Sequence, residues 1–418
     1  MHFRVEFTAL AGDWALGVEF TALARDCGAV NVGQGFPDYA PPAYISDALA
    51  EVASGSDVFL NQYARSAGHG RLVNTLAELY GGLLKRKIDP MKEILATIGA
   101  LQSLYCISNS LLNPGDEAII ISPSYDCYEP QVRMAGAVPV FVALDLDGGI
   151  GKTTADVTLD FAELERKINP KTKLFYLNNP HNPTGKVFTK KELLKIADLA
   201  EKYDLIVIAD EIYEFTVFRP QEMIRFASLP NMWKRTLTVG SAGKVFSMTG
   251  WKLGWTIGPE HFIRSLISTH QNTVFTCPTP IQEAVAVSYE LEMGRWGSPD
   301  SYFNSLPNGE LLPKMKIVAE SLKDMGMPVV IPEGGPFIMA KFSDLDCPTG
   351  SIGGGPKDYG FVRWLCKEKN LAVIPCSAFY PMSLKHLGEN WIRLCFFKKD
   401  ETIRAATDIL KTWALSAR

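Results

Sequence analysis

The stretch LIVIADEIY, residues 205–213, joins a continuous apolar run to a polar segment that begins at Asp210. An unbroken apolar run of this length is typical of a strand buried on both faces of a parallel sheet. Ligand sites of open α/β sheets lie at the carboxyl ends of such strands, so we expect Asp210 to face a ligand. A single aspartate at a strand end is more often a helix cap or a loop residue, so a second feature is needed to support a site.

The second feature is Lys244, which SAGKVFSMTGW, residues 241–251, places among small and hydroxylic residues. An amine that forms a Schiff base needs a confined site that lowers its pKa, and small neighbours let a flat ring lie close to the backbone. An ordinary surface lysine is the alternative for this segment taken alone. The separation from Asp210, 244 − 210 = 34 residues, favours an amine that anchors a cofactor.

Apolar strands and helices alternate through the first three hundred residues. Strands are expected over residues 94–98, 118–121, 138–143, 174–177, 205–209 and 237–239. Thr189 and Glu192 predict a capping box for the helix that follows them. Such alternation implies a largely parallel sheet with helices on both faces. After about residue 300 the strands are separated, over 329–331, 337–342, 371–374 and 392–396, which indicates a smaller α+β domain.

Composition excludes several classes of protein. A net charge of −4, with 47% hydrophobic and 21% charged residues, is typical of a soluble globular protein and gives no electrostatic reason to expect nucleic acid or a membrane as partner. The eight cysteines form no CxxC pair, so we expect no disulfide framework and no metal site. A cytoplasmic location is expected. A mitochondrial one is the alternative, although acidic residues such as Asp13 count against a presequence.

Six ordered segments resemble the class I/II aminotransferases, which are fold type I enzymes dependent on pyridoxal 5′-phosphate (PLP). They are NVGQGFPDY from Asn31, NQYARSAGHG from Asn61, NNPHNPTGK from Asn178, ADEIYE from Ala209, SAGKVFSMTGWKLGW from Ser241 and RLCFFKKD from Arg393. The resemblance is closest to the kynurenine aminotransferase branch, also called glutamine transaminase K or cysteine-S-conjugate β-lyase. YDCYEP from Tyr125, MAGAVPVF from Met134, FNSLP from Phe303 and HLGENWIRLCFFKKD from His386 carry that closer resemblance.

The resemblance implies the PLP-dependent transferase fold type I. In that fold residues 45–300 form a large domain whose mostly parallel seven-stranded sheet is sandwiched by helices, and residues 301–418 form a small α+β domain. Residues 1–44 form an N-terminal arm that contributes to the small domain. VEFTALA occurs in this arm at 5–11 and again at 18–24, and the second copy matches the register of the family. The resemblance also implies a homodimer with shared active sites.

The resemblance implies a role at the cofactor for each of several residues. Lys244 would be both the covalent anchor and the general base, and Asp210 would keep the ring nitrogen protonated. Tyr213 and Asn182 would hydrogen-bond the 3′ oxygen of the ring, on which Tyr125 would stack. The phosphate would bind a helix start and nearby donors, with one tyrosine coming from the neighbouring subunit. These phosphate ligands are Gly99, Ala100, Leu101, Ser241, Lys252 and Tyr63.

Arg393 lies in the apolar run WIRL and is the candidate for binding the substrate. A buried guanidinium is costly without an anion, which is either a substrate carboxylate or a protein Asp or Glu. The resemblance favours the α-carboxylate of the substrate, with Gly35 bringing backbone against it. It also places Asn182, Leu101, Phe275 and Thr276 at the substrate. Leu101, Gly17 and Thr276 differ from close relatives, so we expect a pocket with fewer aromatic walls.

The reaction implied is transfer of an amino group from an L-amino acid to a 2-oxo acid by a ping-pong mechanism. The donors implied are kynurenine, glutamine, and aromatic or sulfur amino acids. A PLP-dependent cysteine-S-conjugate β-lyase is the alternative, because both reactions use the same residues. A non-catalytic PLP-binding regulator is the third hypothesis, which the joint presence of Lys244, Asp210, Tyr213 and Arg393 disfavours.

Overall fold

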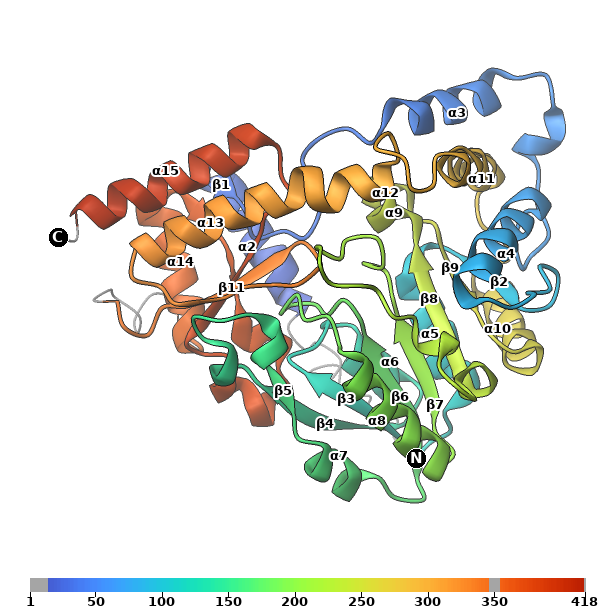
Figure 1. Cartoon of the computed structure of the whole chain (residues 1–418), viewed down its shortest axis with the longest axis horizontal. Coiled ribbons are helices and arrows are strands. Elements are labelled where there is room, and N and C mark those ends of the chain that lie inside the picture. The colour runs from blue at the N-terminus through green and yellow to red at the C-terminus, as the bar shows by residue number, and fades with distance from the viewer. Residues whose placement is uncertain (1–13, 346–353, 417–418) are drawn as a thin grey trace, which may run out of the picture.

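The large sheet has eight strands in the order β2-β9-β8-β7-β6-β3-β4-β5 (Figure 1). A computed structural model describes residues 14–345 and 354–416 of the chain. The strands β8, β7, β6, β3 and β4 are parallel, whereas β9 runs antiparallel between β2 and β8. Their bounds are β2 (Ile94–Thr97), β3 (Glu117–Ser122), β4 (Val138–Asp145), β5 (Thr158–Leu159), β6 (Thr172–Asn178), β7 (Ile206–Asp210), β8 (Thr236–Ser241) and β9 (Gly254–Ile257). The seven strands implied by the resemblance are present, and the two-residue β5 adds an antiparallel edge.

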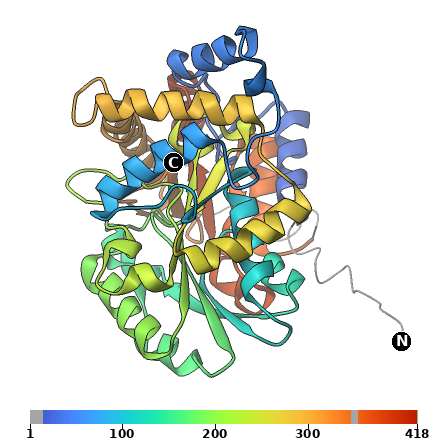
Figure 2. The ribbon, with the colours of Figure 1, turned by 90° about the vertical axis from the view of Figure 1, so that its right-hand side faces the viewer.

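Helices cover both faces of this sheet because its strands are apolar on both sides (Figure 2). In β3, Ile119 and Ile121 belong to one core cluster with residues of α8, while Ala118 and Ile120 belong to another with residues of α5, α6 and α10. The helices are α5 (Gly99–Leu111), α6 (Tyr128–Met134), α8 (Lys190–Lys202) and α10 (Glu260–Thr273), and α7 (Phe161–Lys167) follows β5. The capping box predicted at Thr189 is confirmed at the start of α8.

A second helical layer lies beyond the β2 edge of the sheet (Figure 1). Helix α11 (Thr279–Gly294) packs against α3 (Ala43–Ser54) and α4 (Gly70–Leu84). A helical segment then leads away from this layer through α12 (Tyr302–Ser305), the π-helical turn η7 (Leu306–Leu311) and α13 (Leu312–Asp324). It connects the large sheet to the C-terminal part of the chain.

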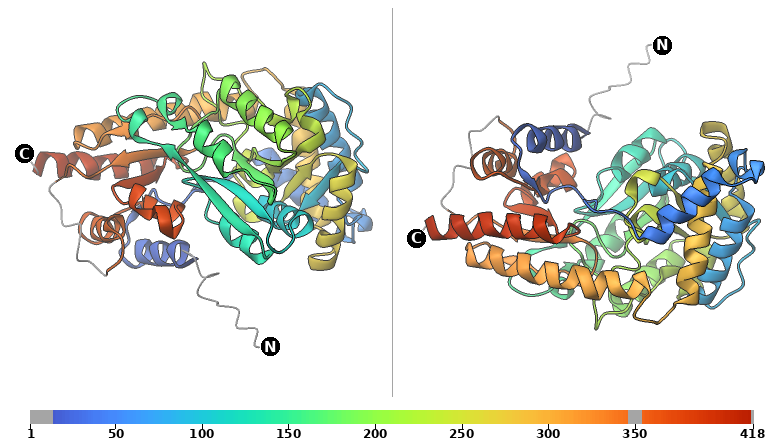
Figure 3. Two further views of the ribbon diagram at one scale, coloured as in Figure 1. Left: turned by 90° about the horizontal axis from the view of Figure 1, so that it is seen from below. Right: turned by 90° about the horizontal axis from the view of Figure 1, so that it is seen from above.

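The C-terminal part is built on a four-stranded antiparallel sheet in the order β10-β11-β14-β13. Its strands are β10 (Val329–Val330), β11 (Phe337–Lys341), β13 (Ile374–Pro375) and β14 (Trp391–Cys395). Helix α15 (Asp400–Ser416) lies beside α13, and α14 (Lys357–Lys369) packs against α2 (Trp14–Asp26) (Figure 3).

The N-terminal arm joins the C-terminal part through one parallel strand pair. Strand β1 (Val30–Asn31) pairs with β12 (Leu371–Ala372), with Val30 opposite Leu371. The second VEFTALA copy lies in α2, whereas the first lies outside the described residues. Within 14–345 and 354–416, no helix combines the length and apolar character needed to cross a bilayer. The domain boundaries at residues 44 and 300 stay predictions.

Candidate active site

A cavity of about 320 Å³ opens where the carboxyl ends of β7 and β8 meet the C-terminal sheet and the loop after β1. This position follows from the parallel strands, whose carboxyl ends meet at one edge of the sheet. All but three of the site residues predicted from the sequence line this cavity. The predicted residues that do line it are Lys244, Asp210, Tyr213, Asn182, Gly99, Ala100, Leu101, Tyr125, Ser241, Lys252, Arg393 and Gly35.

Lys244 lies on α9 (Ala242–Val245), the short helix that follows β8. Its Nζ donates a 2.9 Å hydrogen bond to the carbonyl of Gly35 and lies 5.9 Å from the centre of the Tyr213 ring. Burial lowers the pKa of this amine to about 8, and the charges of Arg393 and Lys252 act in the same direction. In a fraction of the molecules the Lys244 amine is therefore neutral, and so nucleophilic, near neutral pH.

Asp210 is the last residue of β7 and is 2% exposed. Burial raises the pKa of its carboxyl group to about 6, while a hydrogen bond from Tyr128 and the charge of Lys244 act against this rise. The Tyr128 hydroxyl donates to Asp210 Oδ2 at 2.5 Å. Tyr128 was not identified from the sequence. The only sequence signal for it is its place three residues after Tyr125 in YDCYEP.

The first turn of α5 lines the same cavity as Asp210 and Lys244. Its N-cap residue, Ile98, makes no side-chain capping bond, and Gly99, which begins the helix, has φ 71°. The Lys252 ammonium lies beside Gly99, 3.4 Å from where a Cβ at that glycine would be. A Cβ on Gly254 would lie 2.5 Å from the Ala100 nitrogen, so only glycine lets β9 approach the helix start.

This arrangement fits a phosphate group. Helix N–H groups and an ammonium suit an anion, and Ser241 adds a hydroxyl to the same cavity. Among the described residues, no carboxylate forms an ion pair with Lys252. The positive charge is therefore available to a ligand, and the donor set suits the phosphate of PLP.

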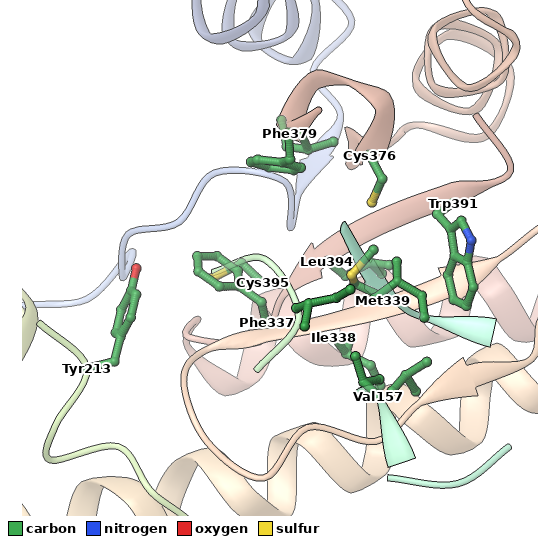
Figure 4. Packing of buried hydrophobic residues seen from close by; sticks show 14 of the residues in the cluster. Val157, Tyr213, Phe337, Ile338, Met339, Cys376, Phe379, Trp391, Leu394 and Cys395 are labelled. Atoms are coloured by element: carbon green, nitrogen blue, oxygen red, sulfur yellow. The ribbon is translucent and has the colours of Figure 1, made fainter. Parts of the chain in front are cut away.

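Arg393 lies on β14, lines the same cavity and is 6% exposed. Its Nη1 donates to Asn182 Oδ1 at 2.9 Å and its Nη2 to the Gly33 carbonyl at 3.0 Å. The guanidinium lies 4.0 Å from the ring centre of Phe337 and 4.7 Å from that of Phe379. Figure 4 shows these two aromatic residues on separate elements of the C-terminal core.

Across the described part of the chain, no Asp or Glu forms an ion pair with Arg393, and its Nε has no hydrogen-bond partner. The alternative of a buried protein ion pair is therefore not found there. Gly33, whose carbonyl orients the guanidinium, was not identified from the sequence. Gly35, expected beside the substrate carboxylate, lies near this guanidinium, because a Cβ on it would be 4.0 Å from Arg393 Nη2 and 2.8 Å from the Phe337 ring. Its carbonyl accepts from Lys244 Nζ, and its contact with substrate stays a prediction.

Tyr63, Phe275 and Thr276 lie outside the cavity of their own chain. The rings of Tyr63 and Phe275 meet edge to face at 5.2 Å, and their exposed fractions are 82% and 47%. Thr276 Oγ1 contacts the carbonyl of Arg65 at 3.5 Å. The contact with substrate expected for Phe275 and Thr276 is not found within the cavity of the single chain and stays a prediction. We call these three residues the Tyr63–Phe275 patch.

The fold and cavity define an α/β enzyme whose cavity holds both a reactive amine and an arginine available for a small carboxylic acid. A sequence model of the family Aminotransferase class I and II matches residues 28–410, and the chain belongs to that family. Human kynurenine–oxoglutarate transaminase 3 is 48% identical to it over 95% of this chain and 88% of that protein. Human kynurenine–oxoglutarate transaminase 1 is 41% identical over 96% of each.

A solved structure agrees with these relatives. Bna3p from Saccharomyces cerevisiae superposes with a TM-score of 0.89, at 29% identity, over 96% of each chain. The chain is therefore an aminotransferase, which moves an amino group from an L-amino acid to a 2-oxo acid, and its family consists of PLP enzymes. The β-lyase and regulator alternatives have no comparable support.

Proposed function

We propose that this chain holds PLP through Lys244 and transfers the amino group of L-kynurenine and other uncharged L-amino acids to oxoglutarate or a similar 2-oxo acid. The observation that carries this proposal is that one cavity is lined both by a buried amine, Lys244, and by a guanidinium, Arg393, that forms no ion pair with a carboxylate in the described residues. The names of the two human relatives support kynurenine as donor and oxoglutarate as acceptor.

Each residue at the cavity has a defined task in this proposal. When bound, PLP supplies an electron-withdrawing ring that stabilises negative charge at the substrate α-carbon. The Asp210 carboxylate would hold the proton on the ring nitrogen by charge pairing, and the Tyr213 hydroxyl and the side-chain amide of Asn182 would donate to the 3′ oxygen. Lys244 Nζ would be the base that takes the proton from the substrate α-carbon.

Arg393 fixes the substrate for that proton transfer. Asn182 and Gly33 each take one of its N–H groups, which sets the plane of the guanidinium and leaves other N–H groups for the substrate carboxylate. The two flanking rings keep water away and limit rotation of the side chain. A carboxylate held there places the α-carbon toward Lys244.

The remaining walls of the cavity favour an uncharged substrate side chain. They include Leu101, Tyr125, Ile374 and Phe36, and the cavity has no cation besides Lys244, Lys252 and Arg393 among its lining residues. An acidic side chain would therefore be buried without a dedicated partner. Leu101 in place of an aromatic residue leaves fewer ring contacts for an aromatic donor, so methionine and glutamine are expected to compete with kynurenine.

We further propose that the chain functions as a homodimer with composite sites. The short helix η1 (Val58–Asn61) adds exposed Val58 and Phe59 to the Tyr63–Phe275 patch, with exposed fractions of 64% and 78%. Contiguous exposed apolar side chains are typical of a protein interface. A second copy would cover them and bring Tyr63 to the phosphate of its neighbour.

The test is a donor panel on the purified holoenzyme, with oxoglutarate and phenylpyruvate as acceptors and 2-oxo acid formation as the measurement. Arg393→Gln removes two charge-assisted hydrogen bonds, so kcat/KM for every donor should fall about 100-fold or more. The control is Arg404→Gln, because the side chain of Arg404 is 70% exposed and lies outside the cavity. Absence of transfer from every amino acid, or equal kinetics in the two variants, would contradict the proposal.

A further inference from the structure

Asp210 is hydrogen-bonded to a second tyrosine, which does not line the cavity and which no motif identified. Tyr128 is the first residue of α6 and is 2% exposed. Its hydroxyl reaches Asp210 Oδ2, and Tyr128 does not line the cavity, whereas Tyr125 does. The two tyrosines of YDCYEP therefore belong to different layers, with one facing the ligand space and the other supporting a residue that faces it.

We propose that Tyr128 is a positioning residue, whose hydroxyl holds the Asp210 carboxylate ionised and correctly aimed for a cationic ring nitrogen and thereby sets the affinity of the site for PLP. This inference rests on the proposed function and deepens it. Tyr128 acts only through Asp210, since it has no access to the ligand space itself.

The geometry fixes Tyr128 before any ligand arrives. Its ring lies 4.8 Å from the Tyr176 ring and 5.7 Å, edge to face, from the Tyr125 ring. Its backbone nitrogen also donates to the Tyr125 carbonyl at 3.2 Å. A donor immobilised by packing costs no reorganisation when the ligand binds. Asp210 Oδ1 makes only a 3.4 Å contact with the Ile212 nitrogen, so this oxygen is available to the ligand.

The surroundings of Asp210 explain why a fixed donor matters. Burial disfavours the ionised carboxylate, and Tyr128 is the largest influence in the opposite direction, ahead of Ile212 N–H and Lys244. The other titratable groups that interact with Asp210 are Glu211, Tyr176 and Tyr213. Burial and Asp210 raise the pKa of Tyr128 well above its usual value, so its hydroxyl keeps its proton and can only stabilise the charged carboxylate.

Tyr176 supplies a matched control. It is also 2% exposed and contacts the same aromatic cluster, but its hydroxyl bonds Ser108 Oγ at 2.6 Å and not Asp210. Tyr128→Phe and Tyr176→Phe each delete one buried hydroxyl within the same layer of the fold. A purely structural effect should therefore appear in both variants, whereas an effect that depends on the hydrogen bond to Asp210 should appear only in the first.

The experiment measures the equilibrium affinity of the apo protein for PLP between pH 5 and 9, together with the melting temperature of each variant. Affinity for PLP should fall on the acid side of this pH range as Asp210 becomes protonated, and we call that part of the curve the acid limb. For Tyr128→Phe we expect the acid limb to move up by about one pH unit, which is about a tenfold loss of affinity at a given pH on that limb. Tyr176→Phe should keep the wild-type limb. In an Asp210→Asn background, adding Tyr128→Phe should change the affinity less than twofold, because no ionised carboxylate remains to be stabilised.

Several outcomes would overturn the inference. It fails if Tyr128→Phe and Tyr176→Phe have the same pH dependence, or if the two changes at Tyr128 and Asp210 are additive. If Tyr128→Phe does not fold, replacement of Tyr128 by 3-fluorotyrosine keeps the ring and strengthens the donor. The acid limb should then move to lower pH, and an unmoved limb would refute the inference. If the wild-type protein itself does not bind PLP, the proposed function fails instead, which is a distinguishable result.

Discussion

The reactivity of Lys244 in the apo protein is the most direct consequence of the site geometry. Burial and two neighbouring cations lower the pKa of its amine from 10.5 to about 8. At pH 7 the neutral fraction is then about 10%, against about 0.03% for an amine at 10.5, which is a gain of about 300-fold. Above pH 8 the gain diminishes, because the neutral form already predominates in the folded protein. Lys244 should therefore be the most rapidly modified lysine at neutral pH.

The assay is brief reductive methylation of the apo protein with limiting formaldehyde and cyanoborohydride from pH 6 to 10, followed by peptide mapping. The labelling rate of Lys244 should rise with a midpoint near pH 8, and the exposed Lys190 provides a reference in the same digest. Arg393→Gln removes a charge that lowers the pKa of Lys244, so the midpoint should move upward and the rate at pH 7 should fall.

Two results would refute this reasoning. If the midpoint for Lys244 lies above about pH 9.5, burial does not depress the pKa of the amine as the contacts require. If Lys244 is labelled no faster than Lys190 at pH 7, the amine is either charged or inaccessible, and its role as the anchoring nucleophile is contradicted.

Two further predictions concern stability and assembly. Burial raises the pKa of the Glu211 carboxyl group from 4.5 to about 8, so only the unfolded state ionises between these values and the free energy of unfolding falls as pH rises through this window. The pKa difference of 3.5 units sets the upper limit of this loss in free energy of unfolding at about 5 kcal/mol. Between pH 5 and pH 8, calorimetry should therefore show the melting temperature of Glu211→Gln rising relative to wild type by up to about 5 °C. The prediction is contradicted if the difference in melting temperature between the two proteins is the same at both pH values. If the sites are composite, unfolding and refolding a mixture of Tyr63→Ala and Lys244→Ala chains should restore about a quarter of the wild-type activity through heterodimers with one intact site. Recovery no greater than that of the separate variants would exclude shared sites.

Local pattern was sufficient for six of the eight strands of the large sheet and for the residues whose chemistry is distinctive. Unbroken apolar runs predicted β3, β4, β6 and β7, because a strand buried on both faces needs apolar side chains at every position. Strand β9 was not predicted from the pattern. It is four residues long, and Gly254 at its start has no side chain to contribute to such a run.

Lys244, Asp210 and Arg393 were identified because an amine, a carboxylate and a guanidinium in apolar surroundings each need a compensating partner, and the sequence alone shows that need. The sequence does not show which residue becomes the partner. Tyr128 lies 82 residues before Asp210, and Gly33 lies 360 residues before Arg393. No spacing rule connects such positions.

The sequence by itself therefore determined the parallel α/β sheet, the amine, the carboxylate and the arginine, because periodicity and residue type carry that information. Only the tertiary structure decided that the Gly35 carbonyl faces Lys244, that Tyr128 supports Asp210 and that Tyr63, Phe275 and Thr276 lie outside the cavity of their own chain. These contacts depend on how α6 packs on the sheet and how the loop after β1 is held by its pairing with β12. Packing brings together residues that the chain keeps far apart, so their contacts exist only once the whole fold has formed.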